Sequence, residues 1–178
     1  MHLPTVKQLV SIILLGVLLT SAIWLYFKIR RPSPSVIVSG KIGEAKITID
    51  YSSPSVKGRK IFGGMLPYDL VWRAGANEAT LFSTNKDIKV EDKTLRAGRY
   101  SFFATPGEKE WIIYFNSEAG QWGDKPDGVT NMDPAKTVLS VTVKPTRLDD
   151  LCERLEYVIR NNGFSLRWEY SEIFVYVK

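Results

Sequence analysis

The sequence predicts an all-β fold, an antiparallel β-sandwich or barrel-like domain, preceded by one N-terminal transmembrane helix. Short segments that alternate apolar and polar residues recur from residue 36 onward, and turn signals separate them at short intervals. Eight Tyr, eight Phe and five Trp supply large side chains of the kind that favours strands. One run of twenty uncharged residues stands apart near the N-terminus.

The uncharged run covers residues 8–27 and has the sequence QLVSIILLGVLLTSAIWLYF. As a helix it is about 30 Å long, enough to cross a hydrocarbon core. Trp24 and Tyr26 stand at one end, where amphipathic rings prefer the membrane interface. We expect residues 1–7 to form a tail and residues 8–27 an uncleaved signal-anchor in a lipid bilayer. The alternative is a cleaved signal peptide with Thr20-Ser21-Ala22 as its exit site, although the apolar run continues past it.

After the anchor, residues 28–35 contain a Pro-Ser-Pro-Ser stretch that predicts a short, semi-rigid linker. The β domain is therefore expected to span residues 36–178. Alternation predicts strands at 45–51, 78–84, 87–90, 94–95, 99–105, 110–116, 137–144, 164–170 and 173–177. Pro106-Gly107 predicts a hairpin turn, and the Gly, Asp, Pro and Asn of residues 119–134 predict a long surface loop.

The segment 148–159 fits two patterns. Its apolar residues fall at helical spacing, yet Leu155, Tyr157 and Ile159 also alternate, and the Asn162-Gly163 that follows is a strong hairpin signal. We expect a strand here, with a helix as the alternative. In the next segment, alternation puts four residues on one face, namely Phe164, Leu166, Trp168 and Tyr170, before a turn at Ser171-Glu172.

Composition argues against several classes of function. The only histidine, His2, precedes the uncharged run, so the domain has no histidine for a catalytic triad or a zinc site. The single Cys152 leaves no partner for an intrachain disulfide. The net charge of +5 is mild and no long run of like charge occurs, so we expect no nucleic-acid partner. We also expect no cofactor, metal or catalytic residue.

Residues 51–80 read YSSPSVKGRKIFGGMLPYDLVWRAGANEAT, and LRAGRYSFF follows at 95–103. These strings resemble the motifs of an uncharacterised bacterial family, domain of unknown function 2911, and the resemblance covers about residues 40–178. It implies an exported protein and carries no known activity. We therefore expect a single-pass protein of the bacterial cytoplasmic membrane with its domain on the outer, periplasmic side. Lys28, Arg30 and Arg31 after the span depart from this, because flanking positive charge favours the cytoplasmic side.

The candidate binding residues lie mostly in this signature. Arg73 offers a planar fork for a carboxylate or phosphate, Trp72 beside it can stack on a sugar or base, and Asn77 and Glu78 would complete a polar pocket. The alternative is that an Arg73–Glu78 ion pair staples the loop with Trp72 in the core.

Two further candidates complete the set. Arg59 belongs to a basic, glycine-containing stretch that either grips a phosphate or forms a plain basic turn. Trp122 is flanked by glycine and aspartate in the long loop, so its indole is expected to be exposed.

Three functions are open at this point. The first is a non-catalytic binding or interaction module of the cell envelope that takes a glycan or an envelope protein. The second is a carboxylate-dependent hydrolase or lyase acting on envelope polysaccharide, which requires two carboxylates to converge among Asp50, Asp69, Glu78 and Asp124. The third is a purely structural envelope protein.

Overall fold

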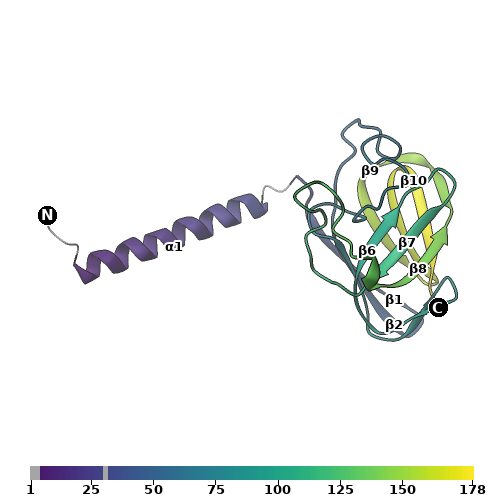
Figure 1. Ribbon diagram of the computed structural model, residues 1–178, viewed down its shortest axis with the longest axis horizontal. Coiled ribbons are helices and arrows are strands. Elements are labelled where there is room, and N and C mark those ends of the chain that lie inside the picture. The colour runs from purple at the N-terminus through teal and green to yellow at the C-terminus, as the bar shows by residue number, and fades with distance from the viewer. Residues whose placement is uncertain (1–4, 30–31) are drawn as a thin grey trace. The chain divides into compact units, whose positions relative to one another are not determined.

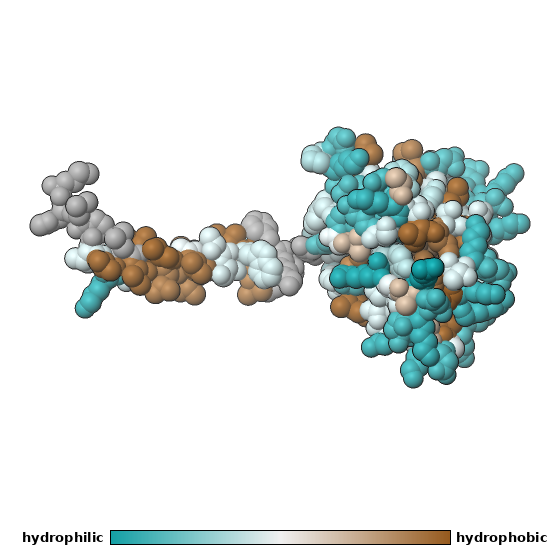
Figure 2. Space-filling model, turned by 60° about the horizontal axis from the view of Figure 1, so that its bottom comes forward, coloured by the Kyte–Doolittle hydropathy of each residue, from teal (hydrophilic) through white to brown (hydrophobic). Residues whose placement is uncertain are grey.

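The computed structural model describes residues 5–29 and 32–178. Contacts divide the chain into two units, Met1–Pro34 and Ser35–Lys178. The first contains helix α1 (Val6–Ile29), which begins with a reciprocal cap between Thr5 and Gln8. Its stretch Val6–Tyr26 is long and apolar enough to cross a membrane, and none of it is buried. Apolar residues cover much of the helix surface in Figure 2.

The second unit is β-rich and sandwich-like. Its first layer is a six-stranded sheet in the order β1-β2-β3-β6-β7-β8, with every neighbouring pair antiparallel. The strands are β1 (Ser35–Ile42), β2 (Ala45–Ser52), β3 (Thr80–Thr84), β6 (Gly98–Thr105), β7 (Trp111–Asn116) and β8 (Thr137–Val143).

The second layer is built on one long hairpin, β9 (Pro145–Arg160) with β10 (Gly163–Tyr176). The register shifts at two places, between Arg167 and Glu169 and between Glu169 and Ser171. Each shift leaves extra residues on β9, which bends the hairpin. As a result the turn between β9 and β10 contacts the residue that follows β10, since Val177 N donates to the carbonyl of Asn162 at 2.9 Å. Figure 1 shows the two ribbons arching at one end of the unit.

A small hairpin, β4 (Ile88–Val90) with β5 (Lys93–Leu95), extends the second layer. Val90 forms a strand bridge with Val177, and Lys89 and Lys178 exchange two backbone hydrogen bonds of 2.8 and 2.9 Å. One turn of 3-10 helix, η1 (Pro134–Lys136), directly precedes β8 and is capped by the Asp133 carboxylate.

The core lies between the layers and consists mainly of aromatic rings. Phe82 and Phe115 from the first layer meet edge to face at 5.1 Å, and Phe164 from the second layer lies 5.3 Å from Phe82. These are the separations at which ring pairs are favourable. All three side chains are at most 1% exposed. Successive side chains of a strand point to opposite faces, so each layer has one apolar face. Packing the two layers together removes both apolar faces from water.

Residues 53–79 connect β2 to β3 without a regular strand, and they pair with β9 instead. Leu155 N donates to the carbonyl of Pro54 at 3.0 Å, and the Ser53 hydroxyl donates to the carbonyl of Leu155 at 2.7 Å. Val56 N donates to the carbonyl of Glu153 at 2.8 Å. The bulged part of β9 therefore finds hydrogen-bond partners in this connection, which fastens the two layers together.

Residues 117–133 form a second long connection, and they lie over the outer face of the six-stranded sheet. Phe103 alternates with the core residue Phe102 and so faces outward, yet it is completely buried. Ser101, on the same face, donates to the Gln121 side chain at 2.9 Å, and Ala79 N donates to the carbonyl of Gln121. The loop therefore covers part of a face that an antiparallel sheet would otherwise expose to water.

The expected all-β fold with an N-terminal apolar helix is confirmed. The segment 148–159 is strand, as favoured above. The expected turn at Ser171-Glu172 is wrong, because β10 runs through both residues. Tyr170 is also not on the face of Trp168. Glu169 adopts a φ of 56° between the two register shifts, and the alternation reverses there, so Tyr170 is exposed while Trp168 is buried.

Candidate recognition site

Arg59, the first of the sequence candidates, fastens its own turn. Its Nε donates to the carbonyl of Val56 at 3.0 Å and its terminal nitrogen donates to the carbonyl of Ser55 at 2.7 Å. The turn needs two left-handed residues in succession, Lys57 at φ 49° and Gly58 at φ 68°. The guanidinium closes this turn, because it binds the carbonyl of Ser55 and shares the carbonyl of Val56 with the backbone N–H of Arg59.

Trp72 belongs to the core. It is 5% exposed, stacks on Trp168 with ring centroids 5.8 Å apart, and donates from its indole nitrogen to the carbonyl of Gly75 at 3.0 Å. Its backbone pairs with Ala104 on β6 through hydrogen bonds of 2.7 and 2.9 Å. The backbone of Trp72 is thus engaged in the sheet, and its ring is engaged in the core of the sandwich.

Arg73 pairs with Asp124 of the 117–133 loop. The side chains are 22% and 29% exposed, so the pair is half-buried with one side open to solvent. Burial lowers the pKa of the Arg73 guanidinium. Gly123 is pressed against this arginine, and a Cβ added there would overlap Arg73 Cδ. Only glycine allows the loop to approach so closely.

Asn77 and Glu78 position the same loop from the other side. Asn77 has a φ of 59°, its side-chain amide donates to the Ser52 hydroxyl at 3.1 Å, and its carbonyl accepts from Gly123 N at 3.0 Å. Glu78 forms an antiparallel bridge with Trp122. The Asn-Glu pair thus provides the short strand-like edge on which residues 121–123 lie.

Trp122 is the exposed aromatic of this region. Its residue is 52% exposed, while Trp72, Trp111 and Trp168 are at most 5% exposed. Its backbone is nevertheless held from two directions, by the bridge to Glu78 and by the Asn131 side-chain amide, which donates to the Trp122 carbonyl at 3.1 Å. The result is a large ring presented to solvent on a fixed backbone.

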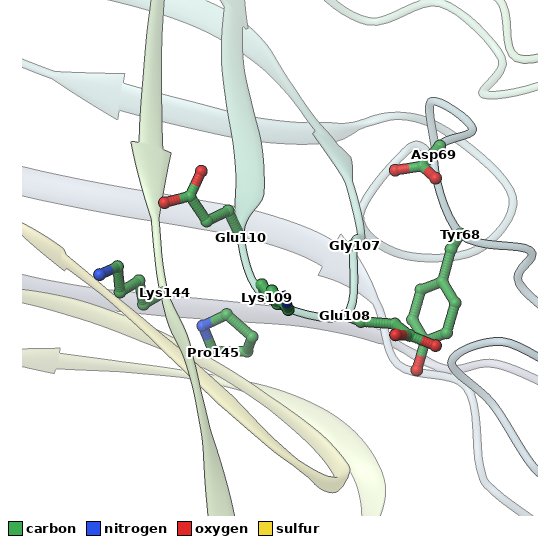
Figure 3. A pocket seen from close by; sticks show the side chains of 8 residues that line it. All are labelled: Tyr68, Asp69, Gly107, Glu108, Lys109, Glu110, Lys144 and Pro145. Carbon is green, nitrogen blue, oxygen red and sulfur yellow. The ribbon is translucent and has the colours of Figure 1, made fainter.

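A separate depression of about 820 Å³ lies between the 66–70 segment, the β6–β7 turn and the start of β9. It contains charged side chains of both signs, and its lining includes Asp69, one of the hydrolase candidates. Figure 3 shows these side chains spread along its rim without converging on a common point. Its complete lining is Tyr68, Asp69, Gly107, Glu108, Lys109, Glu110, Lys144 and Pro145.

The four carboxylates proposed for a hydrolase come from different elements. Asp50 lies on the outward face of β2 beside the Ser35 hydroxyl, Asp69 lines the depression, and Asp124 pairs with Arg73. Glu78 is the bridge partner of Trp122. Within the residues that the structure describes, no group of three or more His, Cys, Asp or Glu is arranged to hold a metal ion.

The structure also adds residues that the sequence did not assign to a binding site, although Asp124 was a candidate for a hydrolase. Asp124, Gly123 and Asn131 fix Arg73 and Trp122, and all three come from the long loop. The one local signal was the order Trp122-Gly123-Asp124, because a glycine between an aromatic and an acid suggests a close backbone approach.

These features can be compared with known proteins. The family described as "Protein of unknown function (DUF2911)" matches residues 33–177, which includes the whole β-rich unit except Lys178. The chain belongs to the DUF2911 family. In this DUF2911 protein Arg59 and Trp72 serve the turn and the core, whereas Trp122 lies on the 117–133 loop. No curated protein and no solved structure matches the chain.

Proposed function

We propose that this DUF2911 protein is a membrane-tethered, non-catalytic binding protein of the cell envelope that recognises a glycan at Trp122. The observation that carries the proposal is the 52% exposed indole on a backbone fixed by Glu78 and Asn131. The C–H face of a sugar ring is apolar and stacks on such a ring. A pre-positioned Trp gives contact area at little cost in conformational entropy.

The surroundings of the ring support a glycan more than an apolar peptide. Asp124 and Lys125 follow Trp122 in the loop, Asp124 pairs with Arg73, and the Asn131 amide donates to the Trp122 carbonyl. The loop therefore carries several polar side chains beside a single exposed aromatic. Sugar hydroxyls need such donors and acceptors. In the view of Figure 2 the β unit shows separate small apolar areas among polar residues, with no broad apolar face.

The tether in this proposal is α1, placed across the cytoplasmic membrane with the β unit on its outer side. Its support is the length and apolar character of Val6–Tyr26, none of which is buried. The outer placement follows from the resemblance to exported proteins.

The test uses residues 33–178, which contain the whole core and no residue of α1. Acrylamide quenches exposed indoles, and Trp122 is the exposed Trp of this fragment. A glycan that binds should protect the fluorescence, and calorimetry should lose the binding in Trp122→Ala. Tyr176→Ala is the matched control because Tyr176 is 53% exposed on β10. Equal binding by wild type and Trp122→Ala would reject Trp122 as the site.

A further inference from the structure

The Arg73–Asp124 pair joins two connections that are distant in the sequence, 53–79 and 117–133. A guanidinium carries five N–H donors and is most stable when all of them have acceptors. In the described part of the chain, Arg73 Nε is buried without a hydrogen-bond partner, so Asp124 does not satisfy the whole group. The pair keeps a solvent-facing side, as the exposures of 22% and 29% show.

Residues 122–124 carry both the exposed indole ring and the carboxylate that pairs with Arg73. Trp122 faces solvent, Gly123 lies against the Arg73 side chain, and Asp124 pairs with its guanidinium. The Gly123 amide is fixed by the carbonyl of Asn77 at 3.0 Å, so the backbone between Trp122 and Asp124 is held in place. The exposed indole and the carboxylate that pairs with Arg73 are therefore two residues apart on one fixed stretch of the loop.

We infer that the ligand is an acidic glycan, whose sugar ring stacks on Trp122 and whose carboxylate binds Arg73 in competition with Asp124. This rests on the proposed function of Trp122. Asp124 itself shows that a carboxylate fits the guanidinium at this place. A planar fork binds a carboxylate with two parallel hydrogen bonds, which a hydroxyl cannot reproduce, so the site distinguishes acidic from neutral sugars.

Asp124 is then an internal competitor, and its removal gives a specific test. In Asp124→Asn the side chain keeps its size and loses its charge, so Arg73 is left without its anionic partner. A ligand carboxylate should fill that role. We expect the variant to bind galacturonic acid hexamers about tenfold more tightly than wild type, with no change for neutral glucose hexamers.

The measurement is calorimetric titration of the 33–178 fragment with both hexamers, repeated at high salt. Asp127→Asn is the control, because Asp127 lies in the same loop and accepts a hydrogen bond from Val129 N that an asparagine oxygen can also accept. Thermal unfolding is followed in parallel. The acidic hexamer should raise the melting temperature of Asp124→Asn more than that of wild type, since it restores a partner to Arg73.

A second variant separates charge from shape. Arg73→Lys keeps a cation without the planar fork, and it should lose most of the preference for the acidic hexamer while retaining binding through Trp122. Equal gains for both hexamers in Asp124→Asn, or an unchanged affinity for the acidic one, would overturn the acidic-glycan inference and leave the Trp122 proposal standing. Wild type that binds neither hexamer would overturn both.

Discussion

Tyr157 illustrates how single residues hold the two layers together. It is 3% exposed, its hydroxyl donates to the carbonyl of Ala74 at 2.8 Å, and its ring meets that of Tyr51 at 4.7 Å. Burial raises the pKa of Tyr157 well above the ordinary value, and burial likewise raises the pKa of Tyr51. Burial also raises the pKa of the Cys152 thiol to about 11.

These raised pKa values predict loss of stability in alkali. The folded state favours the neutral phenol, so its stability is intact below the unfolded pKa of about 10 and falls as the pH rises through and beyond it. The urea midpoint measured from pH 7 to 11 should therefore decline above about pH 9. Tyr157→Phe should flatten the decline, while Tyr51 and Cys152 keep part of it.

Tyr176→Phe is the control for this titration, because Tyr176 is 53% exposed. Absorbance of tyrosinate recorded on the same samples shows when the buried phenols ionise. A pH slope in Tyr157→Phe as steep as in wild type would refute the assignment to Tyr157.

Among the elements, the bent β9–β10 hairpin depends on Glu169. Its backbone is left-handed at φ 56°, and its two carboxylate oxygens accept from Ile61 N at 3.2 Å and Phe62 N at 3.4 Å. The bend of the hairpin and the path of the signature segment are thus fixed by the same side chain. Phe62 in turn packs edge to face on Trp111 and Trp168, so the position of the segment that Glu169 holds directly affects packing in the core.

Replacing Glu169 by Ala should lower the free energy of unfolding by about 1–3 kcal/mol, since two backbone N–H groups lose their acceptor. Urea denaturation of the 33–178 fragment measures this. Glu108→Ala is the comparison, because Glu108 is exposed on the β6–β7 turn. Two variants of equal stability would mean that the carboxylate does not hold the bend.

At the level of elements, the sequence predicts features that neighbouring residues determine and misses contacts between residues that are far apart in the sequence. Alternation located most of the strands, and Ile47 and Ile49 on one face of β2 are buried as the period requires, but it did not locate β1 (Ser35–Ile42). It placed Tyr170 wrongly, because a single left-handed residue reverses the period without a local signal other than Glu169 itself. The Arg73–Asp124 pair was not predictable, since no spacing rule connects residues in two separate loops.

For the whole molecule, the distribution of charge separates the two units. Lys7, Lys28, Arg30 and Arg31 are four of the 24 basic residues, so residues 35–178 have 20 basic and all 19 acidic residues, a net charge of +1. The excess charge therefore lies on both flanks of the apolar helix. Such flanks attract anionic lipid headgroups, whereas the nearly neutral β unit has no broad positive field of the kind that binds nucleic acid.

The tether proposal predicts how the full chain partitions. It should remain with membranes in high salt and dissolve only with detergent, because apolar burial and not surface charge holds it, while the 33–178 fragment should be soluble. Protease added to spheroplasts should digest the β unit if it lies on the outer side. Protection of the β unit until the membrane is opened would place it inside, as the three cations after the helix favour.

The pairing of the chain's distant parts also has a consequence for synthesis. Pro54 and Ser53 pair with Leu155, and Asn162 pairs with Val177, so the sandwich is not complete until the last strand has left the ribosome. The early strands emerge first and carry unpaired edges meanwhile. A chain with so many sequence-distant pairs folds slowly compared with a helical bundle. The nascent protein is therefore a natural client for a holding chaperone, and its output in a cell should depend on that supply.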